Sequence, residues 1–97
     1  MAQEKQFENK IKKFLKDNNI WYVKYFANAF TQAGISDILA CVNGRFVAIE
    51  VKAEKGKPSE LQLYHQQKIK DSGGIAYILY PKDFDEFKKD IINLLDK

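Results

Sequence analysis

The fold of this chain is decided by residues 34–52, which read GISDILACVNGRFVAIEVK. The dipeptide Asn43-Gly44 is a strong signal for a two-residue hairpin turn, and it predicts strands over residues 38–42 and 45–52. One face of this hairpin carries only apolar side chains, those of Ile38, Ala40, Val42, Val47, Ile49 and Val51. The other face carries Leu39, Cys41, Phe46 and Ala48 before its charged end. Because both faces are mostly apolar, we expect helices to cover the sheet on both sides.

The charged end of the hairpin consists of two acids and a lysine. The two-residue turn puts Asp37 opposite Glu50, and Lys52 lies on the same face because side chains alternate along a strand. Directly opposed Cβ atoms are about 5 Å apart, so two bare carboxylates would repel each other. A divalent cation is the simplest compensation, and the backbone carbonyl of Val51 can supply another oxygen ligand. The alternative is an ordinary Asp–Lys or Glu–Lys salt bridge at the sheet edge, which does not require a second carboxylate.

Composition limits the classes of protein to which the chain can belong. Its 97 residues are 45% hydrophobic and 30% charged, as expected for one small globular domain. The net charge of +3 permits nucleic-acid binding, while a single arginine, Arg45, argues against arginine-based base readout. The single cysteine, Cys41, suits a reducing cytoplasm, and we expect it to pack in the core. We expect no membrane span and no secretion signal.

Hydrophobic periodicity predicts the elements on either side of the hairpin. Helices are expected over residues 3–18, from Ser59 to Gly73-Gly74, and from Asp83 onward. Strands are expected over residues 20–26 and 75–80, and a loop over residues 27–34. The pairs Ser59/Gln62 and Asp83/Glu86 have capping-box spacing. The resulting order is α-β-β-β-α-β-α, and the helix between the last two strands permits a parallel crossover, so we expect an α/β fold with a mixed sheet flanked by helices.

Further residues are candidates for a site, each with a structural alternative. On the first helix, Glu8 falls on the flank of the apolar face and Glu4 nearer its centre. Either acid can point toward a site, or it can simply be an acid near the start of the helix that the helix dipole favours. The only histidine, His65, has no metal-binding partner in the sequence. Lysines of the first helix, together with Lys55 and Lys57, can meet phosphate or form a solvated face. The aromatic residues Trp21, Tyr22, Tyr25 and Phe26 suit a core or a dimer interface better than base stacking.

In order and spacing, four short motifs resemble the PD-(D/E)XK nuclease superfamily, and more closely its small stand-alone VRR-NUC domains from phages and bacteria. They are Gly34-Ile35-Ser36-Asp37, Ile49-Glu50-Val51-Lys52, the pair Ser59 and Gln62, and Phe7-Glu8. Lys24 stands at a position that is often basic in that family. Ser36 replaces the usual proline, a tolerable departure because proline shapes the backbone and does not bind metal. The resemblance covers roughly residues 4–80 and implies a single VRR-NUC-like nuclease domain over residues 1–97, with a PD-(D/E)XK nuclease-like core.

The resemblance implies a metal-dependent DNA endonuclease that hydrolyses phosphodiester bonds with Mg²⁺ or Mn²⁺. Asp37, Glu50 and the Val51 carbonyl would bind the metal, and Lys52 would be the catalytic lysine. By the same resemblance, Glu8 would be the acid from the first helix. Gln62 would reach toward the site from the second helix or cap that helix, but we do not expect both at once.

The same resemblance bears on the substrate, the assembly and the compartment. It implies action on branched DNA, as in Holliday-junction resolvases, by a homodimer in the cytoplasm of a bacterial or phage-infected cell. Three alternatives stay open at this point. They are a nuclease for flaps, forks or duplex DNA, a nucleic-acid-binding module without turnover, and a purely structural domain.

Overall fold

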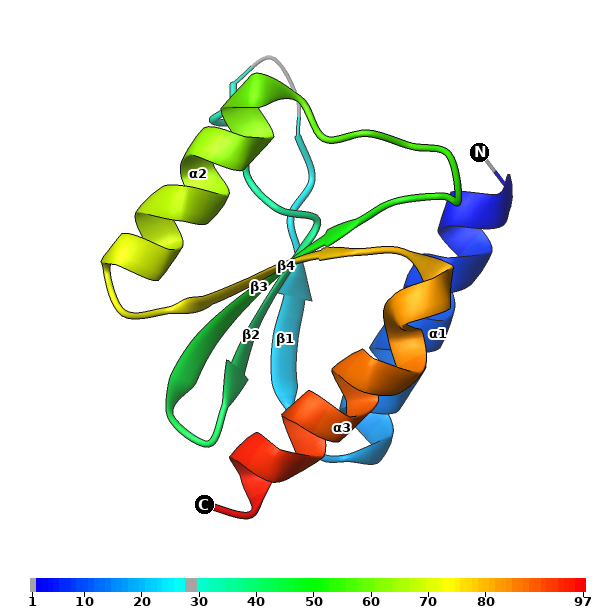
Figure 1. Ribbon diagram of the computed structural model, residues 1–97, viewed down its shortest axis with the longest axis vertical. Helices are drawn as coiled ribbons and strands as arrows, with labels where there is room; N and C mark the ends of the chain where they lie inside the picture. Colours follow the sequence, from blue (N-terminus) through cyan, green and yellow to red (C-terminus); the bar gives the residue numbers. More distant parts are fainter. Residues whose placement is uncertain (1, 28–29) are drawn as a thin grey trace.

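The computed structural model describes residues 2–27 and 30–97, which form a four-stranded sheet between helices (Figure 1). The elements are α1 (Ala2–Asp17), β1 (Trp21–Lys24), β2 (Ile38–Val42), β3 (Arg45–Val51), α2 (Glu60–Asp71), β4 (Ile75–Leu79), the 3₁₀ turn η1 (Pro81–Asp83) and α3 (Phe84–Leu95). This confirms the predicted α-β-β-β-α-β-α order. The loop expected over residues 27–34 includes residues 28 and 29, which lie outside the described part. None of the helices in the described ranges is both long and apolar enough to span a membrane.

The sheet is mixed, as predicted, with the strand order β1-β2-β3-β4. β1, β2 and β3 pair antiparallel, and β4 runs parallel to β3 after the crossover through α2. The hairpin has the predicted register, with Leu39 facing Ala48. Asn43 and Gly44 have φ angles of 50° and 82°, as a turn with two left-handed residues requires. β1 is shorter than the strand expected over residues 20–26, although the Tyr25 amide still donates to the Asp37 carbonyl at 2.8 Å.

The main core lies between the sheet and a layer made of α1 and α3, which run along one side of the sheet in Figure 1. All six residues of the uniformly apolar hairpin face are buried in it, as predicted. The two helices also pack on each other, since the rings of Phe7 and Phe84 form an edge-to-face pair with centroids 5.5 Å apart. This packing fixes α1 against the sheet and thereby fixes the position of Glu8.

The opposite face of the sheet is only partly covered, which corrects the expectation of two buried faces. α2 packs against β4 and leaves a row of exposed side chains on the first three strands. Trp21 pairs with Cys41, which pairs with Phe46, and Trp21 and Phe46 are 65% and 46% exposed. Cys41 is also exposed, so the prediction that it packs in the core is wrong. The reason is width, because one helix is about 10 Å across while four strands span roughly 15 Å or more.

Helix capping follows the prediction at α2 and departs from it at α3. Ser59 and Gln62 form a complete capping box, in which the Gln62 amide donates to Ser59 Oγ and the Ser59 amide to Gln62 Oε1. Asp83 precedes α3, but its side chain makes no capping bond, so the box predicted with Glu86 is wrong. The 3₁₀ turn gives Asp83 φ and ψ of −98° and 2°, whereas a capping residue needs an extended backbone.

Candidate active site

The two predicted acids and the lysine meet at one end of the sheet, where β2 begins and β3 ends. The last pair of the hairpin ladder is Ile38 with Ile49, and the same register continued by one residue puts Asp37 opposite Glu50. The Val51 amide donates to Asp37 Oδ2 at 2.8 Å, which holds this carboxylate against the end of β3. The charged end of the hairpin is therefore a compact cluster.

Glu50 is buried in this cluster, and its two carboxylate oxygens have different surroundings. Oε2 accepts a hydrogen bond from Gln62 Nε2 at 2.8 Å and lies 3.2 Å from Lys52 Nζ. Oε1 is buried without any hydrogen-bond partner, and among residues 2–27 and 30–97 no other side-chain nitrogen or oxygen is both buried and unpaired. A buried polar atom without a partner lowers the stability of the fold. Glu50 Oε1 is therefore a position where a ligand can bind with little competition from the protein.

The electrostatics of the cluster favour binding of a cation. Burial, as the largest cause, and the negative charge of Asp37 together raise the pKa of Glu50 to about 7. Lys52 acts in the opposite direction, but it does not offset both effects. Two carboxylates that share a buried site resist being charged together unless further positive charge is supplied.

A second charged network, formed by Lys24 and Glu8, reaches the cluster from α1. Lys24 Nζ donates to Glu8 Oε1 at 2.8 Å and to Asp37 Oδ1 at 3.4 Å, and Lys12 Nζ lies 3.2 Å from Glu8 Oε2. Burial acts against both charges, yet these contacts hold the pKa of Glu8 below its usual value and that of Lys24 above it. Of the two candidate acids of α1, Glu8 thus enters the site, and it does so through Lys24.

Gln62 joins α2 to the cluster and caps the same helix. Its Oε1 accepts from the Ser59 amide at 2.8 Å while its Nε2 donates to Glu50. The expectation that Gln62 would serve only one of these purposes is wrong. A primary amide carries its acceptor and its donors on different atoms, so one side chain can do both.

The sequence analysis missed Gln66, which lies one helical turn after Gln62. Gln66 is 4% exposed, and its Nε2 donates to Ser36 Oγ at 2.8 Å. This buried bond fixes Ser36, the residue before Asp37. The hydroxyl of Ser36 stands where proline is usual in the family that the sequence resembles. The available signal was the four-residue spacing from Gln62, which puts both amides on one face of a helix.

Gly34 allows α2 to approach the chain before Asp37. Its φ is +80°, and a Cβ at this position would lie 2.6 Å from Leu61 Cγ and 3.1 Å from the Leu61 carbonyl carbon. Both the backbone angle and the close approach therefore require glycine. This close contact packs α2 on the segment that leads to Asp37.

The structure brings together Asp37, Glu50, Lys52 and Gln62, and it connects Glu8 to them. It does not bring His65 into the cluster. His65 packs edge-to-face on Tyr64, with ring centroids 5.2 Å apart, and its Nε2 lies 3.5 Å from Gln32 Nε2.

The residues fit a hard divalent cation between Asp37 and Glu50. Across the described ranges, no three His, Cys, Asp or Glu side chains lie together as a metal-binding group, so this end of the sheet supplies two carboxylates. An extended residue directs its N–H and C=O toward the same neighbouring strand. Since the Val51 amide faces Asp37, its carbonyl faces the same side and suits the predicted third ligand. Such an incomplete shell suits Mg²⁺, which keeps several waters.

The sequence matches no model of a known protein family, and it matches no curated protein.

Proposed function

We propose that this chain is a metal-dependent DNA endonuclease that hydrolyses phosphodiester bonds, with Mg²⁺ or Mn²⁺ held by Asp37, Glu50 and the Val51 carbonyl. The observation that carries the proposal is the carboxylate of Glu50. Its Oε1 is buried without a partner, and its pKa is raised to about 7 beside a second acid. A salt bridge alone would leave this oxygen unsatisfied, whereas a bound cation satisfies it.

Each residue of the cluster has a defined task in this proposal. The ion, when bound, would activate a water and offset negative charge on the phosphate. Gln62 Nε2 and Lys52 Nζ orient Glu50 through the same oxygen, which leaves Oε1 free for the ion. Lys52 has further N–H donors, with which it can hold a phosphate oxygen or orient the attacking water. Glu8 holds Lys24, which balances the charge of Asp37.

DNA as the substrate, and branched DNA in particular, is supported by the resemblance to VRR-NUC and other PD-(D/E)XK nucleases. Under that proposal the protein acts on four-way junctions or related branches in the cytoplasm. The other candidate is a nucleic-acid-binding module that does not turn over. The presence of both acids and the lysine in one contact network favours catalysis over that candidate.

A homodimer is part of the proposal, and the exposed row on the sheet supports it. Trp21, Cys41 and Phe46 form this row across three neighbouring strands. Val23 lies two residues after Trp21 on the same face and is 40% exposed. An apolar surface of this kind on a small domain suits an interface. A two-fold dimer would present two active sites to the two strands of a branched substrate.

Cleavage assays test the proposed function directly. Four-way, flapped and linear duplex DNA are incubated with the protein in Mg²⁺, in Mn²⁺ and in EDTA, alongside Asp37→Ala and Lys52→Ala. Lys89→Ala serves as the matched control, because Lys89 is an exposed lysine on α3, outside the cluster. We expect metal-dependent cutting that falls by about 100-fold or more in both site variants and persists in the control.

Each contrary result has a separate meaning. Cleavage in EDTA, or undiminished cleavage by Asp37→Ala, would reject the metal mechanism. Binding without cutting under every condition would favour the binding module. Equal rates on junction and linear DNA would reject the preference for branched substrates.

A further inference from the structure

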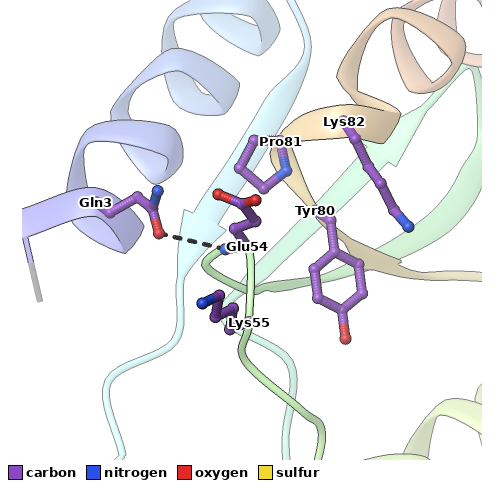
Figure 2. A pocket seen from close by; sticks show the side chains of 6 residues that line it. All are labelled: Gln3, Glu54, Lys55, Tyr80, Pro81 and Lys82. Carbon is purple, nitrogen blue, oxygen red and sulfur yellow. Dashed lines mark hydrogen bonds between the residues drawn. The ribbon is translucent and has the colours of Figure 1, made fainter.

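Two adjoining cavities meet on Tyr80, just beyond the strands that end at the cluster. The larger, about 630 Å³, lies between the first turn of α1, the loop after β3 and the turn after β4 (Figure 2). The second, about 450 Å³, continues along the same loop to Lys57. Lys55, Tyr80 and Lys82 line both. Volumes of this size suit a small ligand or one unit of a polymer.

Asp37, Glu50, Lys52 and Gln62 do not line these cavities, but the loop that does line them contacts the candidate active site. The Lys52 amide donates to the Leu79 carbonyl at 3.0 Å, so Tyr80 follows directly on a residue bonded to the proposed catalytic lysine. The loop also touches that lysine, since a Cβ on Gly56 would lie 3.4 Å from Lys52 Cδ. The cavities therefore begin beside the loop that packs on Lys52.

The lining of the two cavities is basic, and its lysines are available to bind an anion. Among the described residues, the amines of Lys55, Lys57 and Lys82 take part in no ion pair. One acid, Glu54, lines both cavities, so three lysines face one carboxylate. This excess of positive charge favours an anionic ligand.

The aromatic ring of Tyr80 is held in a fixed orientation within this basic lining. Its hydroxyl donates to the Gly56 carbonyl at 2.8 Å, and Lys82 Nζ lies 5.8 Å from the ring centroid. Gln3 Oε1 accepts from the Glu54 amide at 3.3 Å, which ties the same loop to α1. In Figure 2, Lys82 lies beside the ring, whereas Lys55 extends from the neighbouring loop away from it. Proteins that bind single-stranded nucleic acids combine an aromatic ring, on which a base stacks, with nearby basic side chains.

We propose that Tyr80, Lys55 and Lys82 form a subsite for one unpaired nucleotide next to the phosphate that is cut. The base stacks on the Tyr80 ring, and the flanking phosphates lie against the two lysines. This inference rests on the proposed nuclease function and extends it to the shape of the substrate. A base inside a duplex is already stacked on both sides, so only a base freed at a branch, flap or end can occupy the subsite.

Stacking can be tested with a double-mutant cycle between the protein and the DNA. A single abasic position is moved along the unpaired arm of a flapped substrate, and affinity is measured by fluorescence anisotropy in EDTA. For the wild type, we expect one abasic position to weaken binding about 5- to 150-fold. In Tyr80→Leu the intact substrate should bind weakly and that abasic position should have no further effect. Tyr80→Phe keeps the ring without the bond to Gly56, so it should retain the effect.

The lysines are tested by the salt dependence of the same binding. Lys55→Gln and Lys82→Gln should each reduce the slope of log affinity against log salt by about 0.7 to 1, whereas Lys89→Gln should not change it. Glu54→Gln should strengthen binding, because it removes the one negative charge of the lining. Circular dichroism spectra establish that each variant is folded.

The outcomes separate the subsite from the nuclease function. Cutting by the wild type with no effect of any abasic position, or with equal effects in wild type and Tyr80→Leu, overturns the subsite alone. An abasic effect that depends on Tyr80, without cutting in Mg²⁺ or Mn²⁺, overturns the nuclease function and keeps the subsite. If the wild type binds no DNA, both proposals are overturned.

Discussion

Gln62 donates from Nε2 to Glu50 Oε2 at 2.8 Å, while its Oε1 accepts from the backbone amide of Ser59, the residue that caps α2. One side chain thus connects the start of a helix to a buried carboxylate on the sheet. The orientation of Glu50 and the stability of the helix end depend on the same amide. Substitutions at the two ends of the capping box should therefore have different consequences.

Ser59→Ala removes one capping bond and leaves the contact between Gln62 and Glu50. We expect it to lower the free energy of unfolding by about 1 kcal/mol with little change in metal affinity. Gln62→Ala should lower that free energy by a larger amount and also weaken metal binding. Chemical denaturation and calorimetric titration with Mn²⁺ measure the two effects. Equal metal affinity in the two variants would contradict a role for Gln62 in orienting Glu50.

Glu50 should make the stability of the metal-free protein depend on pH. Its pKa is about 7 in the folded state against an ordinary value of 4.5. The folded state therefore binds the proton more tightly, and this contribution is complete below pH 4.5 and is lost as pH rises through 7. In EDTA, we expect the free energy of unfolding to fall over this range by at most about 3 kcal/mol relative to Glu50→Gln. If the free energies of unfolding of the wild type and of Glu50→Gln differ by the same amount at every pH in this range, the raised pKa is contradicted.

A bound cation should stabilise the fold at pH 8, which lies above the pKa of about 7 of Glu50. Mg²⁺ or Mn²⁺ at 100 times its dissociation constant should add about 2.7 kcal/mol to the free energy of unfolding. Asp37→Asn should lose this gain, whereas Asp17→Asn should keep it because Asp17 pairs with Lys13 on the exposed side of α1. Thermal unfolding at constant ionic strength measures the gain. The same gain in both variants would point to nonspecific binding.

Gly34→Ala should displace α2, and Gly73→Ala provides the matched control. Both glycines have positive φ, +80° and +93°, but a Cβ at Gly73 would meet nothing within 4 Å. Gly73→Ala should therefore cost about 1–2 kcal/mol of unfolding free energy through backbone strain alone. Gly34→Ala should cost roughly 1–3 kcal/mol more, because Leu61 must move. Denaturation curves compare the two, and equal losses would contradict the close packing of α2 on Gly34.

Dimer formation through the exposed row should change the fluorescence of Trp21, the only tryptophan in the chain. Trp21 is 65% exposed in the single chain, so its emission should shift to shorter wavelength as the protein concentration rises. Phe46→Glu adds a charge to the same row and should suppress the shift. Light scattering gives the mass in parallel. A monomer mass at micromolar concentration, with no spectral shift, would reject the dimer.

Local rules were sufficient for most of the fold and for the centre of the site. Asn43-Gly44 accepts positive φ angles at two consecutive positions, and this alone determines the hairpin register that sets Asp37 opposite Glu50. The alternating apolar residues determined which hairpin face is buried. The spacing of Ser59 and Gln62 was enough to identify the capping box, because both partners lie within one helical turn.

The predictions that failed have two different causes, one local and one that depends on packing between distant segments. The same capping-box spacing at Asp83 did not form a box, because Pro81 begins a 3₁₀ turn that alters the backbone there. Cys41 belongs to an apolar strand, yet it is exposed because one helix is too narrow to cover the sheet face. No local pattern reports how far a neighbouring helix extends.

By itself, the sequence determined the order of the elements, the hairpin register and the identity of the two acids and the lysine, since each follows from neighbours along the chain. Only the tertiary structure decided that Glu8 contacts the cluster through Lys24, that Gln62 both caps α2 and binds Glu50, and that Gln66 holds Ser36. Those contacts join residues 12 to 30 positions apart. They exist because α1 and α2 pack against the end of the sheet, and such packing depends on the whole core.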